Sequence, residues 1–241
     1  MVGGVGGRGY RCGMTQDSPT PDPGSVAGAA EPSAPGAPGR TPRADQRIVW
    51  IDCEMTGLDL TRDALVEIAC VVTESDLTLV DEGMTVVIKP PDEPLEQMDP
   101  VVVEMHNNSG LIHEIPHGVT LTEATQQVLA YVQRHVPEAR RAPLGGSTVY
   151  VDRGFLARDM PAVDAHLHYR LVDVSSLKEL IKRWYPSVYY SAPEKTGNHR
   201  ALGDILDSIA ELQYYRNAVI APVESAVPEP ADPPTASAGA D

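Results

Sequence analysis

Residues 47–54 read Arg-Ile-Val-Trp-Ile-Asp-Cys-Glu, an apolar run that ends in two acids. The β-branched residues of this run predict a strand. Because strand side chains alternate between two faces, Asp52 and Glu54 would point to the same side, about 6.5–7 Å apart along the chain. Cys53 would point to the opposite face, where packing suits it better than chemistry. We therefore expect a buried strand that carries a pair of carboxylates at its end.

Further patterns along the chain predict a sheet covered by helices. The other runs that predict strands are 65–73, 84–89, 147–151 and, ambiguously, 171–174. Apolar residues at helical spacing predict helices that begin near Thr120 and near Ser175 or Ser176, and a last one over 201–219. Three strands followed by a mixed remainder indicate an α/β fold, a mixed β-sheet flanked by α-helices.

The composition changes sharply at both ends of the 241-residue chain. Residues 1–46 hold ten Gly and seven Pro, and residues 220–241 hold five Pro and no Lys or Arg. Such segments bury too little apolar surface to offset their ordering entropy, so we expect both to be disordered tails. Residues 47–219 would then form a single domain.

The charge and the cysteines exclude several classes of protein. The formal charge of −15 argues against a protein that grips long duplex nucleic acid through a basic face. It leaves room for a short nucleic acid held through metal ions. Three cysteines without metal-ligand spacing favour neither a disulfide framework nor a zinc site. No apolar run approaches a membrane span, and the first residues lack the apolar core of a secretory signal, so we expect a cytoplasmic protein.

Three carboxylates could form a cation site. Asp52 and Glu54 suit hard, oxygen-seeking cations such as Mg²⁺ or Mn²⁺. The alternative, that the strand has reached solvent and both acids are hydrated, is equally good from this pair alone. Asp152 stands where a strand should meet a helix, and it could face the same site or merely cap that helix.

His199 and Asp204 form a further candidate pair. Residues five apart on a helix differ by about 140°, so the two could meet at one site only if His199 precedes the helix. Gly197 and Asn198 favour a turn at that place. Asp204 interrupts an apolar helix stripe, and a part-buried carboxylate needs a partner such as a cation. An imidazole beside it could serve as a base.

Together these acids and the histidine follow the order Asp-x-Glu, Asp, His-x4-Asp. The pattern resembles the DEDDh branch of the 3′-to-5′ exonucleases, which have a ribonuclease-H-like fold. Within that branch, residues 47–219 are most similar to the oligoribonuclease family. The segments that carry the resemblance are 50–58 (Trp-Ile-Asp-Cys-Glu-Met-Thr-Gly-Leu), 152–156 (Asp-Arg-Gly-Phe-Leu), 167–180, and 197–204 (Gly-Asn-His-Arg-Ala-Leu-Gly-Asp).

The resemblance implies a metal-dependent exoribonuclease that shortens oligoribonucleotides from the 3′ end, down to dinucleotides, and releases 5′-mononucleotides. His199 would be the general base and Tyr169 a second catalytic residue. Two divalent cations, Mg²⁺ or Mn²⁺, would be held by the four acids Asp52, Glu54, Asp152 and Asp204. Two such ions can activate water and stabilise charge at phosphorus and at the leaving oxygen.

The resemblance also implies a substrate site and a homodimer. Leu58 would wedge against the terminal bases, and His106 would lie near the nucleotide. The 5′ phosphate would be capped by Thr148 and Ser175 together with Tyr169 and Arg170, the last two from the partner subunit. The residues alone favour the plainer interpretation, in which Leu58 is a turn residue packed on the core and residues 168–170 are an ordinary helix exit.

The chain also departs from the family pattern. Ser147 and Thr148 follow a glycine, at the two positions where the family usually has Asn and Ser. Tyr150 stands where a small residue is common. Val101 stands where many members stack a tryptophan on a base. Two rivals remain. One is a DNA-proofreading or tRNA-trimming exonuclease of the same branch, and the other is a module of this fold that binds nucleotides without cleaving them.

Overall fold

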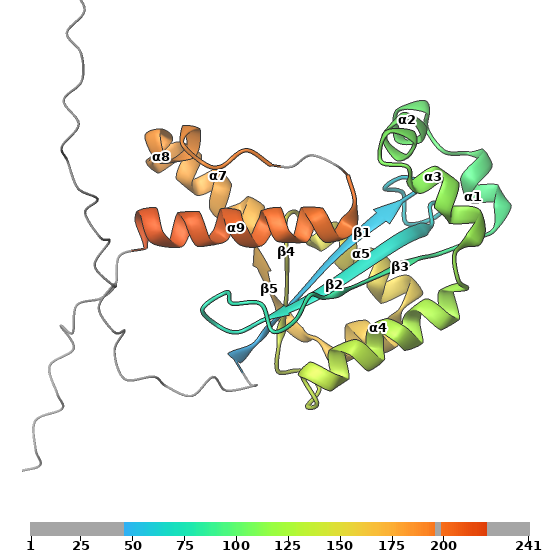
Figure 1. Cartoon of the computed structure of the whole chain (residues 1–241), viewed down its shortest axis with the longest axis horizontal. Helices are drawn as coiled ribbons and strands as arrows, with labels where there is room; N and C mark the ends of the chain where they lie inside the picture. The colour runs from blue at the N-terminus through green and yellow to red at the C-terminus, as the bar shows by residue number, and fades with distance from the viewer. Residues whose placement is uncertain (1–45, 196–198, 221–241) are drawn as a thin grey trace, which may run out of the picture. The chain divides into compact units, whose positions relative to one another are not determined.

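The computed structural model describes residues 46–195 and 199–220 (Figure 1). The expected tails, 1–46 and 220–241, lie outside these residues except for Gln46 and Ile220. The strands are β1 (Ile48–Met55), β2 (Leu65–Thr73), β3 (Met84–Val87), β4 (Pro143–Gly146) and β5 (His168–Asp173). The helices are α1 (Asp92–Glu96), α2 (Pro100–Asn108), α3 (Leu111–Glu114), the 3₁₀ helix η2 (Ile115–His117), α4 (Leu121–His135), α5 (Tyr150–Asp159), α6 (Pro161–His166), α7 (Val174–Trp184), α8 (Pro186–Tyr190) and α9 (Ala201–Val219).

The strands form one mixed sheet. Their order among the described residues is β3-β2-β1-β4-β5, with β1 in the middle. β2 runs antiparallel to both β1 and β3, whereas β4 is parallel to β1 and to β5. The central position of β1 and its cover on both faces explain why residues 48–51 read as an uninterrupted apolar run. The expected α/β fold class is confirmed.

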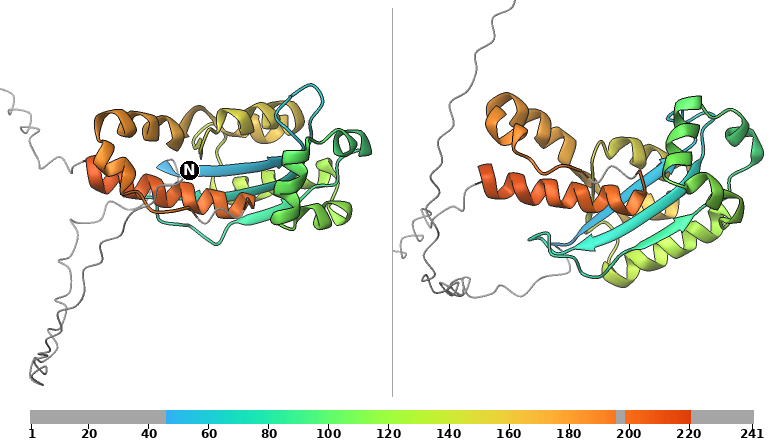
Figure 2. Two further views of the ribbon diagram at one scale, coloured as in Figure 1. Left: turned by 90° about the horizontal axis from the view of Figure 1, so that it is seen from above. Right: turned by 45° about the horizontal axis from the view of Figure 1, so that its top comes forward.

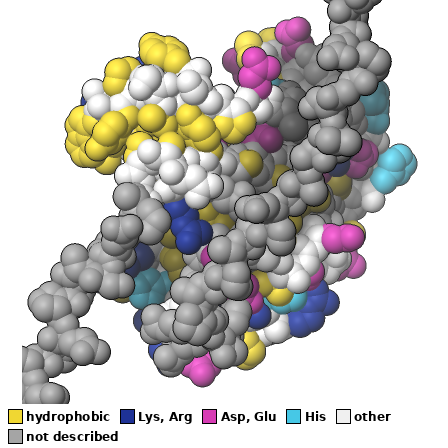
Figure 3. Space-filling model, turned by 60° about the vertical axis from the view of Figure 1, so that its left-hand side comes forward, with side chains coloured by type: hydrophobic (Ala, Val, Ile, Leu, Met, Phe, Trp, Pro, Cys, Tyr) yellow, Lys and Arg dark blue, Asp and Glu magenta, His cyan; other side chains and the backbone are white. Residues whose placement is uncertain are grey.

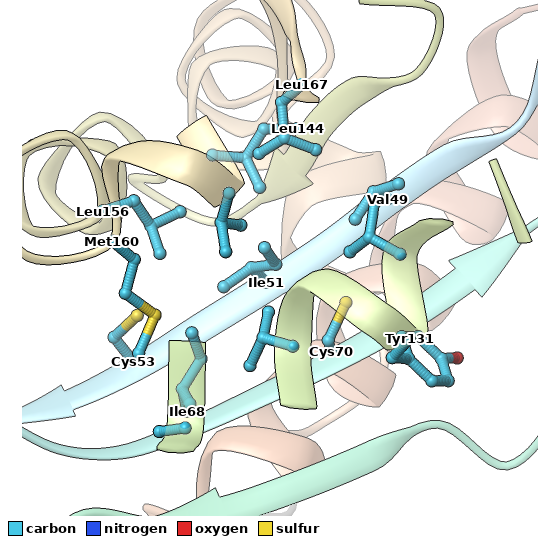
Figure 4. Close-up of a cluster of buried hydrophobic side chains, with 14 of the residues drawn as sticks. Val49, Ile51, Cys53, Ile68, Cys70, Tyr131, Leu144, Leu156, Met160 and Leu167 are labelled. Atoms are coloured by element: carbon cyan, nitrogen blue, oxygen red, sulfur yellow. The ribbon is translucent and has the colours of Figure 1, made fainter. Parts of the chain in front are cut away.

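Helices cover the two faces of the sheet. Val49 and Ile51 of β1 pack into a cluster with residues of α4, α5 and α6 (Figure 4). Trp50 lies between them in sequence and points to the other face, where it packs with Ile205 and Ile209 of α9. Figure 1 shows α4 and α9 on opposite sides of the sheet, and the left view of Figure 2 shows α5 and α7 in a row beside β1, on the side where β4 and β5 lie. Residues of β1 with even numbers therefore face α9.

Local signals set the ends of several helices as expected. Thr120 caps α4 in a capping box, since its side chain accepts from the Glu123 N–H and the Glu123 side chain accepts from the Thr120 N–H. Asp173 caps α7 by accepting from the Ser175 N–H. The last helix spans Ala201–Val219, as the apolar spacing predicts.

The strand expected over 147–151 is wrong. The strand lies earlier, at Pro143–Gly146, and Tyr150 already begins α5. Thr148 has a φ of 60°, which ends extended structure between the two elements. Gly145 lies in this strand, where a Cβ would be 2.9 Å from the Trp50 ring. Only glycine therefore permits the close approach of this strand to β1.

Of the helices within residues 46–195 and 199–220, none combines the length and the apolar character that a membrane span requires.

Candidate functional site

Three carboxylates meet where β1 ends beneath α9. Oxygen atoms of Asp52, Glu54 and Asp204 all lie within 4.8 Å of one another. Asp52 and Glu54 share the α9-facing side of β1, and Asp204 lies in the first turn of α9. The predicted alternation along β1 is thus confirmed. Glu54 is buried and Asp52 half-buried, which contradicts the alternative of two hydrated surface acids.

Asp152 joins this group from α5. Its Oδ1 accepts a hydrogen bond from the backbone N–H of Cys53, at 3.0 Å, between the two acids of β1. Its side chain is not the cap of α5, whose N-cap residue is Val149. Of the two roles left open by the sequence, the structure therefore supports a place beside the β1 acids. We call Asp52, Glu54, Asp152 and Asp204 the acidic cluster.

Burial and mutual repulsion disfavour the charged form of these carboxyl groups. Burial, followed by the charges of Asp152, Asp204 and Glu54, raises the pKa of Asp52 to about 9. Burial, followed by the charge of Asp204, raises the pKa of Glu54 to about 8. Burial is also the main cause that raises the pKa of Asp152, to about 7. So much negative charge in one place calls for compensation, and oxygen donors alone are the ligand set of hard divalent cations.

Cys53 does not take part in this chemistry. Its side chain lies on the face of β1 opposite to Asp52 and Glu54, in the core cluster with Leu156 and Met160 (Figure 4). Burial, followed by the charge of Asp152, raises the pKa of the thiol well above its usual value. A protonated, enclosed thiol is a poor nucleophile, so packing is its role, as expected.

His199 lies immediately before α9, with a φ of 48° and an exposed side chain. This is the arrangement under which His199 and Asp204 could approach one site. The charge of His199 lowers the pKa of Asp204, although burial raises it overall. The imidazole therefore lies within electrostatic range of the acidic cluster, open to solvent and to a ligand.

His106 of α2 reaches the same site from the other side. Its ring is buried, and Nε2 lies 2.9 Å from the Met55 carbonyl oxygen. Since a carbonyl only accepts, Nε2 carries the hydrogen. Burial lowers the pKa of the ring, so the ring is neutral and Nδ1 is an acceptor. Nδ1 lies 4.0 Å from Glu54 Oε2 and makes no hydrogen bond within the described part of the chain.

Thr148 and Ser175 come together at the end of β4. The Thr148 N–H donates to Asp173 Oδ1 at 2.9 Å and to Ser175 Oγ at 3.1 Å. The Ser175 hydroxyl donates to the same Asp173 oxygen at 2.8 Å. The two residues that the resemblance assigns to one phosphate are thus neighbours, although 27 positions separate them.

Tyr169 and Arg170 lie elsewhere. They belong to β5, which begins directly after Leu167, the C-cap of α6, so this stretch does lead out of a helix, into a strand. In the register with β4, His168 lies opposite Pro143 whereas Asp173 lies opposite Gly146. Tyr169 and Arg170 are therefore near the opposite end of the strand from Ser175, about 10 Å or more away at 3.3 Å per residue. The structure does not bring them to the acidic cluster of their own chain.

The remaining positions singled out from the sequence are open to solvent. Leu58 is 71% exposed, Val101 73% and Tyr150 66%. Leu58 is therefore not a turn residue packed on the core. The Tyr150 side chain stands at the first residue of α5, two positions before Asp152.

Sequence reasoning missed Glu67 and Arg200. Glu67 of β2 is fully buried directly opposite Glu54, and it forms an ion pair with Arg200 at 2.6 Å. A charged residue inside the apolar run 65–73 was the one available signal, because a buried carboxylate requires a partner.

Comparisons with known proteins agree with this site. The sequence model of the RNase T family, described as exonuclease, matches residues 49–212. Curated oligoribonucleases from Streptomyces avermitilis and Leifsonia xyli subsp. xyli are each 59% identical, over 178 and 175 residues. The alignments cover 74% and 73% of this chain, and 89% and 84% of those proteins.

Solved structures of similar fold include exonuclease I, with a TM-score of 0.56 at 14% identity over 71% of this chain. Another is E. coli exonuclease I in complex with a dA16 oligonucleotide, with a TM-score of 0.55 at 14% identity over 71% of this chain. This chain spans 41% of the length of each, and at such low identity the likeness shows the fold alone.

Proposed function

The chain belongs to the oligoribonuclease branch of the RNase T exonuclease family, and on that premise we propose that it is a divalent-metal-dependent 3′-to-5′ exoribonuclease. Its substrates are short oligoribonucleotides, down to dinucleotides, and its products are 5′-mononucleotides released in the cytoplasm. The single observation that carries the proposal is the convergence of Asp52, Glu54 and Asp204 within 4.8 Å, with Asp152 bonded between the first two.

The acidic cluster would hold two divalent cations, Mg²⁺ or Mn²⁺. The donor set fits, because all four side chains offer oxygen and their raised pKa values mark charge that lacks compensation. When bound, such cations supply an activated water and neutralise charge at the phosphate and at the leaving oxygen.

His199 accepts the proton from the attacking water. Its exposed ring, placed just ahead of α9 and within electrostatic range of Asp204, leaves a ring nitrogen free to face that water. A positioned base of this kind contributes roughly 100- to 10,000-fold to the rate. Asp204 lies five residues further on, in the first turn of α9, so the proposed base stands next to the acidic cluster.

The 3′ end of the substrate lies between α2 and the residues that follow β1. His106 Nδ1, a buried acceptor beside Glu54, suits a hydroxyl group of the terminal nucleotide. Leu58, which is exposed beyond the end of β1, offers an apolar wedge against the terminal bases. Thr148 offers a hydroxyl group to a 5′ phosphate, and Ser175 would offer a second one on turning its hydroxyl hydrogen from Asp173 to the phosphate. Contacts of this kind limit the substrate to a short one held at both ends.

A homodimer completes this site. Tyr169 and Arg170 would reach the 5′ phosphate bound by a second copy, since they lie far from the cluster of their own chain. β5 is an edge strand, and exposed apolar side chains accompany it: Tyr169, Leu171, Leu180, Trp184 and Tyr185. Figure 3 views the side on which α7 and α8 lie, and hydrophobic side chains gather on it. An exposed edge with such side chains favours pairing with another chain.

A time course on defined substrates tests the proposal. We would incubate the full chain with 5′-phosphorylated RNAs of two to about seven nucleotides, and with single-stranded DNA of the same lengths, in Mg²⁺, Mn²⁺ or chelator. We expect mononucleotides to be released stepwise from the RNA 3′ end, fastest from the dinucleotide, and not in chelator.

Two variants make this test specific. Asp52→Asn removes one charge of the cluster at constant volume and should abolish turnover. Glu138→Gln removes an exposed acid whose pairing with Arg141 is on the surface, and it should leave turnover unchanged. Faster cleavage of DNA than of RNA would favour the proofreading alternative. Binding of RNA without any cleavage would favour the non-cleaving module.

A further inference from the structure

Glu67 is a fully buried carboxylate that contacts the start of α9. On one side its Oε1 accepts from Arg200 Nη2 at 2.6 Å and from Nε at 3.0 Å. On the other side its Oε2 accepts from the backbone N–H of Ala201, the first residue of α9, at 3.0 Å. One side chain of β2 thus binds two consecutive residues at the beginning of α9.

Arg200 also binds a third element. Its Nη1 lies 2.8 Å from Glu114 Oε1, and its Nη2 lies 3.1 Å from Glu114 Oε2. Glu114 ends α3, which packs against α2, the helix of His106. A single guanidinium therefore ties β2, α3 and the start of α9 together. The planar fork of arginine suits this paired geometry, whereas a lysine ammonium would not reproduce it.

Arg200 stands in the chain between two residues of the proposed site. His199 precedes it directly, in a backbone conformation with φ of 48° that few residues other than glycine adopt. Asp204 follows it by one helical turn, and the Asp204 N–H donates to the Arg200 carbonyl at 3.1 Å. The backbone of Arg200 therefore links the proposed base to a member of the acidic cluster.

We propose that Arg200 is a positioning residue. Through its ion pair with Glu67, it holds His199 and the first turn of α9 at a fixed place over the acids of β1. This inference rests on the proposed function for its kinetic consequence. Displacing a reacting group by about 1 Å can cost on the order of 100-fold in rate, so a side chain that never touches substrate can control turnover.

A simpler role for Arg200 would be to compensate the charge of buried Glu67. Removing Arg200 alone cannot separate the two roles, because it leaves a buried carboxylate unpaired and could unfold the chain. The double variant Glu67→Gln/Arg200→Met separates them. It removes both charges, and the introduced glutamine keeps an oxygen that can accept from the Ala201 N–H. The hydrogen bonds between the side chains at positions 67 and 200 are lost.

The experiment compares this double variant with the wild type, with Arg200→Lys and with a control, Arg141→Met, which removes an exposed arginine paired only at the surface. The readouts are kcat and KM on a 5′-phosphorylated diribonucleotide, the melting temperature, and hydrogen exchange of the amides at 199–204. We expect the double variant to melt cooperatively but below the wild type, because the amide hydrogens of the introduced glutamine are buried without a partner, and to lose on the order of 10- to 100-fold in kcat with little change in KM. Exchange at 199–204 should be faster, while the core strands stay protected.

Wild-type kcat and wild-type exchange in the double variant would overturn the inference and leave Arg200 as a charge partner only. Arg200→Lys, which keeps the charge without the fork, should fall between the wild type and the double variant in kcat. If the wild type releases no mononucleotide from any RNA, the proposed function fails. The exchange readout would still decide whether Arg200 holds the 199–204 segment.

Discussion

Asp152 Oδ1 lies 3.0 Å from the backbone nitrogen of Cys53, the residue between Asp52 and Glu54. This hydrogen bond joins α5 to β1 in the middle of the acidic cluster. A carboxylate that accepts from the backbone is held in one orientation, and it still presents its negative charge to the neighbouring acids. Orientation and charge can therefore be separated by substitution.

Asp152→Asn should abolish most turnover without loss of stability. The asparagine oxygen still accepts from the Cys53 N–H, but one unit of charge is gone, and we expect kcat to fall by roughly 100-fold or more, about 3 kcal/mol of transition-state stabilisation. The measurements are kcat on a diribonucleotide and the melting temperature. Asp159→Asn, at the far end of α5 and paired with Arg158, is the control and should keep wild-type turnover. Unchanged kcat in Asp152→Asn would remove Asp152 from the cation site.

Metal-free protein should lose stability as the pH rises. Burial, followed by neighbouring negative charges, raises the pKa of Asp52 from 3.8 to about 9 and that of Glu54 from 4.5 to about 8. Between these ordinary and raised values the folded chain binds more protons than the unfolded chain, so the free energy of unfolding falls with increasing pH. We expect the melting temperature in chelator to drop between about pH 5.5 and about pH 8.5.

Added Mg²⁺ or Mn²⁺ should reverse this trend, because cations bind the deprotonated carboxylates and stabilise the folded state only. The stabilisation by metal should therefore grow with pH. Asp52→Asn, which removes the most strongly shifted group, should flatten the slope in chelator. The same slope in the wild type with and without metal would contradict the assignment of these acids as ligands.

His199→Ala should slow turnover roughly 100- to 10,000-fold while leaving metal affinity near that of the wild type. The reason is that His199 is proposed to move a proton and to bind no cation. Calorimetric titration with Mn²⁺ measures the affinity, and kcat measures the rate. His199→Gly should show the same loss of rate and equal or higher stability, because glycine adopts a φ of 48° without strain.

His117→Ala, which removes an exposed histidine of η2, is the matched control and should behave like the wild type. Parallel losses of metal affinity and of rate in His199→Ala would instead assign this residue a structural role in the site.

Local patterns predicted much of the fold because several elements are specified by neighbouring residues. The apolar run over β2 and the capping box of α4 lie within a few positions of chain. The strand expected over 147–151 failed for the opposite reason. Val149 and Tyr150 have high β-propensity, but the strand lies at Gly145, whose lack of a Cβ matters only against Ile48 and Trp50 of another strand.

The residues of the candidate site were likewise predicted where local patterns specify them and missed where distant residues pair. Alternation along β1 predicted that Asp52 and Glu54 share a face, and the Gly-Asn pair before position 199 in the sequence predicted that His199 precedes the helix of Asp204. Glu67 and Arg200 lie 133 positions apart, so no local pattern could pair them. The place of Asp152 likewise depends on a hydrogen bond to a residue 99 positions away.

Mixing two inactive variants should restore activity if Arg170 acts across a dimer interface. Asp52→Asn lacks a working cluster, and Arg170→Ala lacks the proposed phosphate contact. In a mixed dimer, one of the two sites would combine an intact cluster with an intact Arg170 from the other subunit. With random exchange of subunits we expect about a quarter of wild-type activity on a 5′-phosphorylated dinucleotide. A mixture no more active than the sum of its parts would contradict a contact of Arg170 across a dimer interface.

Val101→Trp should tighten substrate binding. Val101 is 73% exposed in the first turn of α2, on the helix that carries His106, and the family resemblance places a stacking tryptophan there. A base that stacks on an aromatic ring gains about 1–3 kcal/mol, so we expect KM for a diribonucleotide to fall about fivefold or more. Val101→Leu enlarges the side chain without adding an aromatic face, and it should leave KM nearly unchanged. Because position 101 is exposed, both variants should melt like the wild type. An equal effect of Leu and Trp would show that apolar area, rather than stacking, governs binding at this position, and no effect of either would place the bases elsewhere.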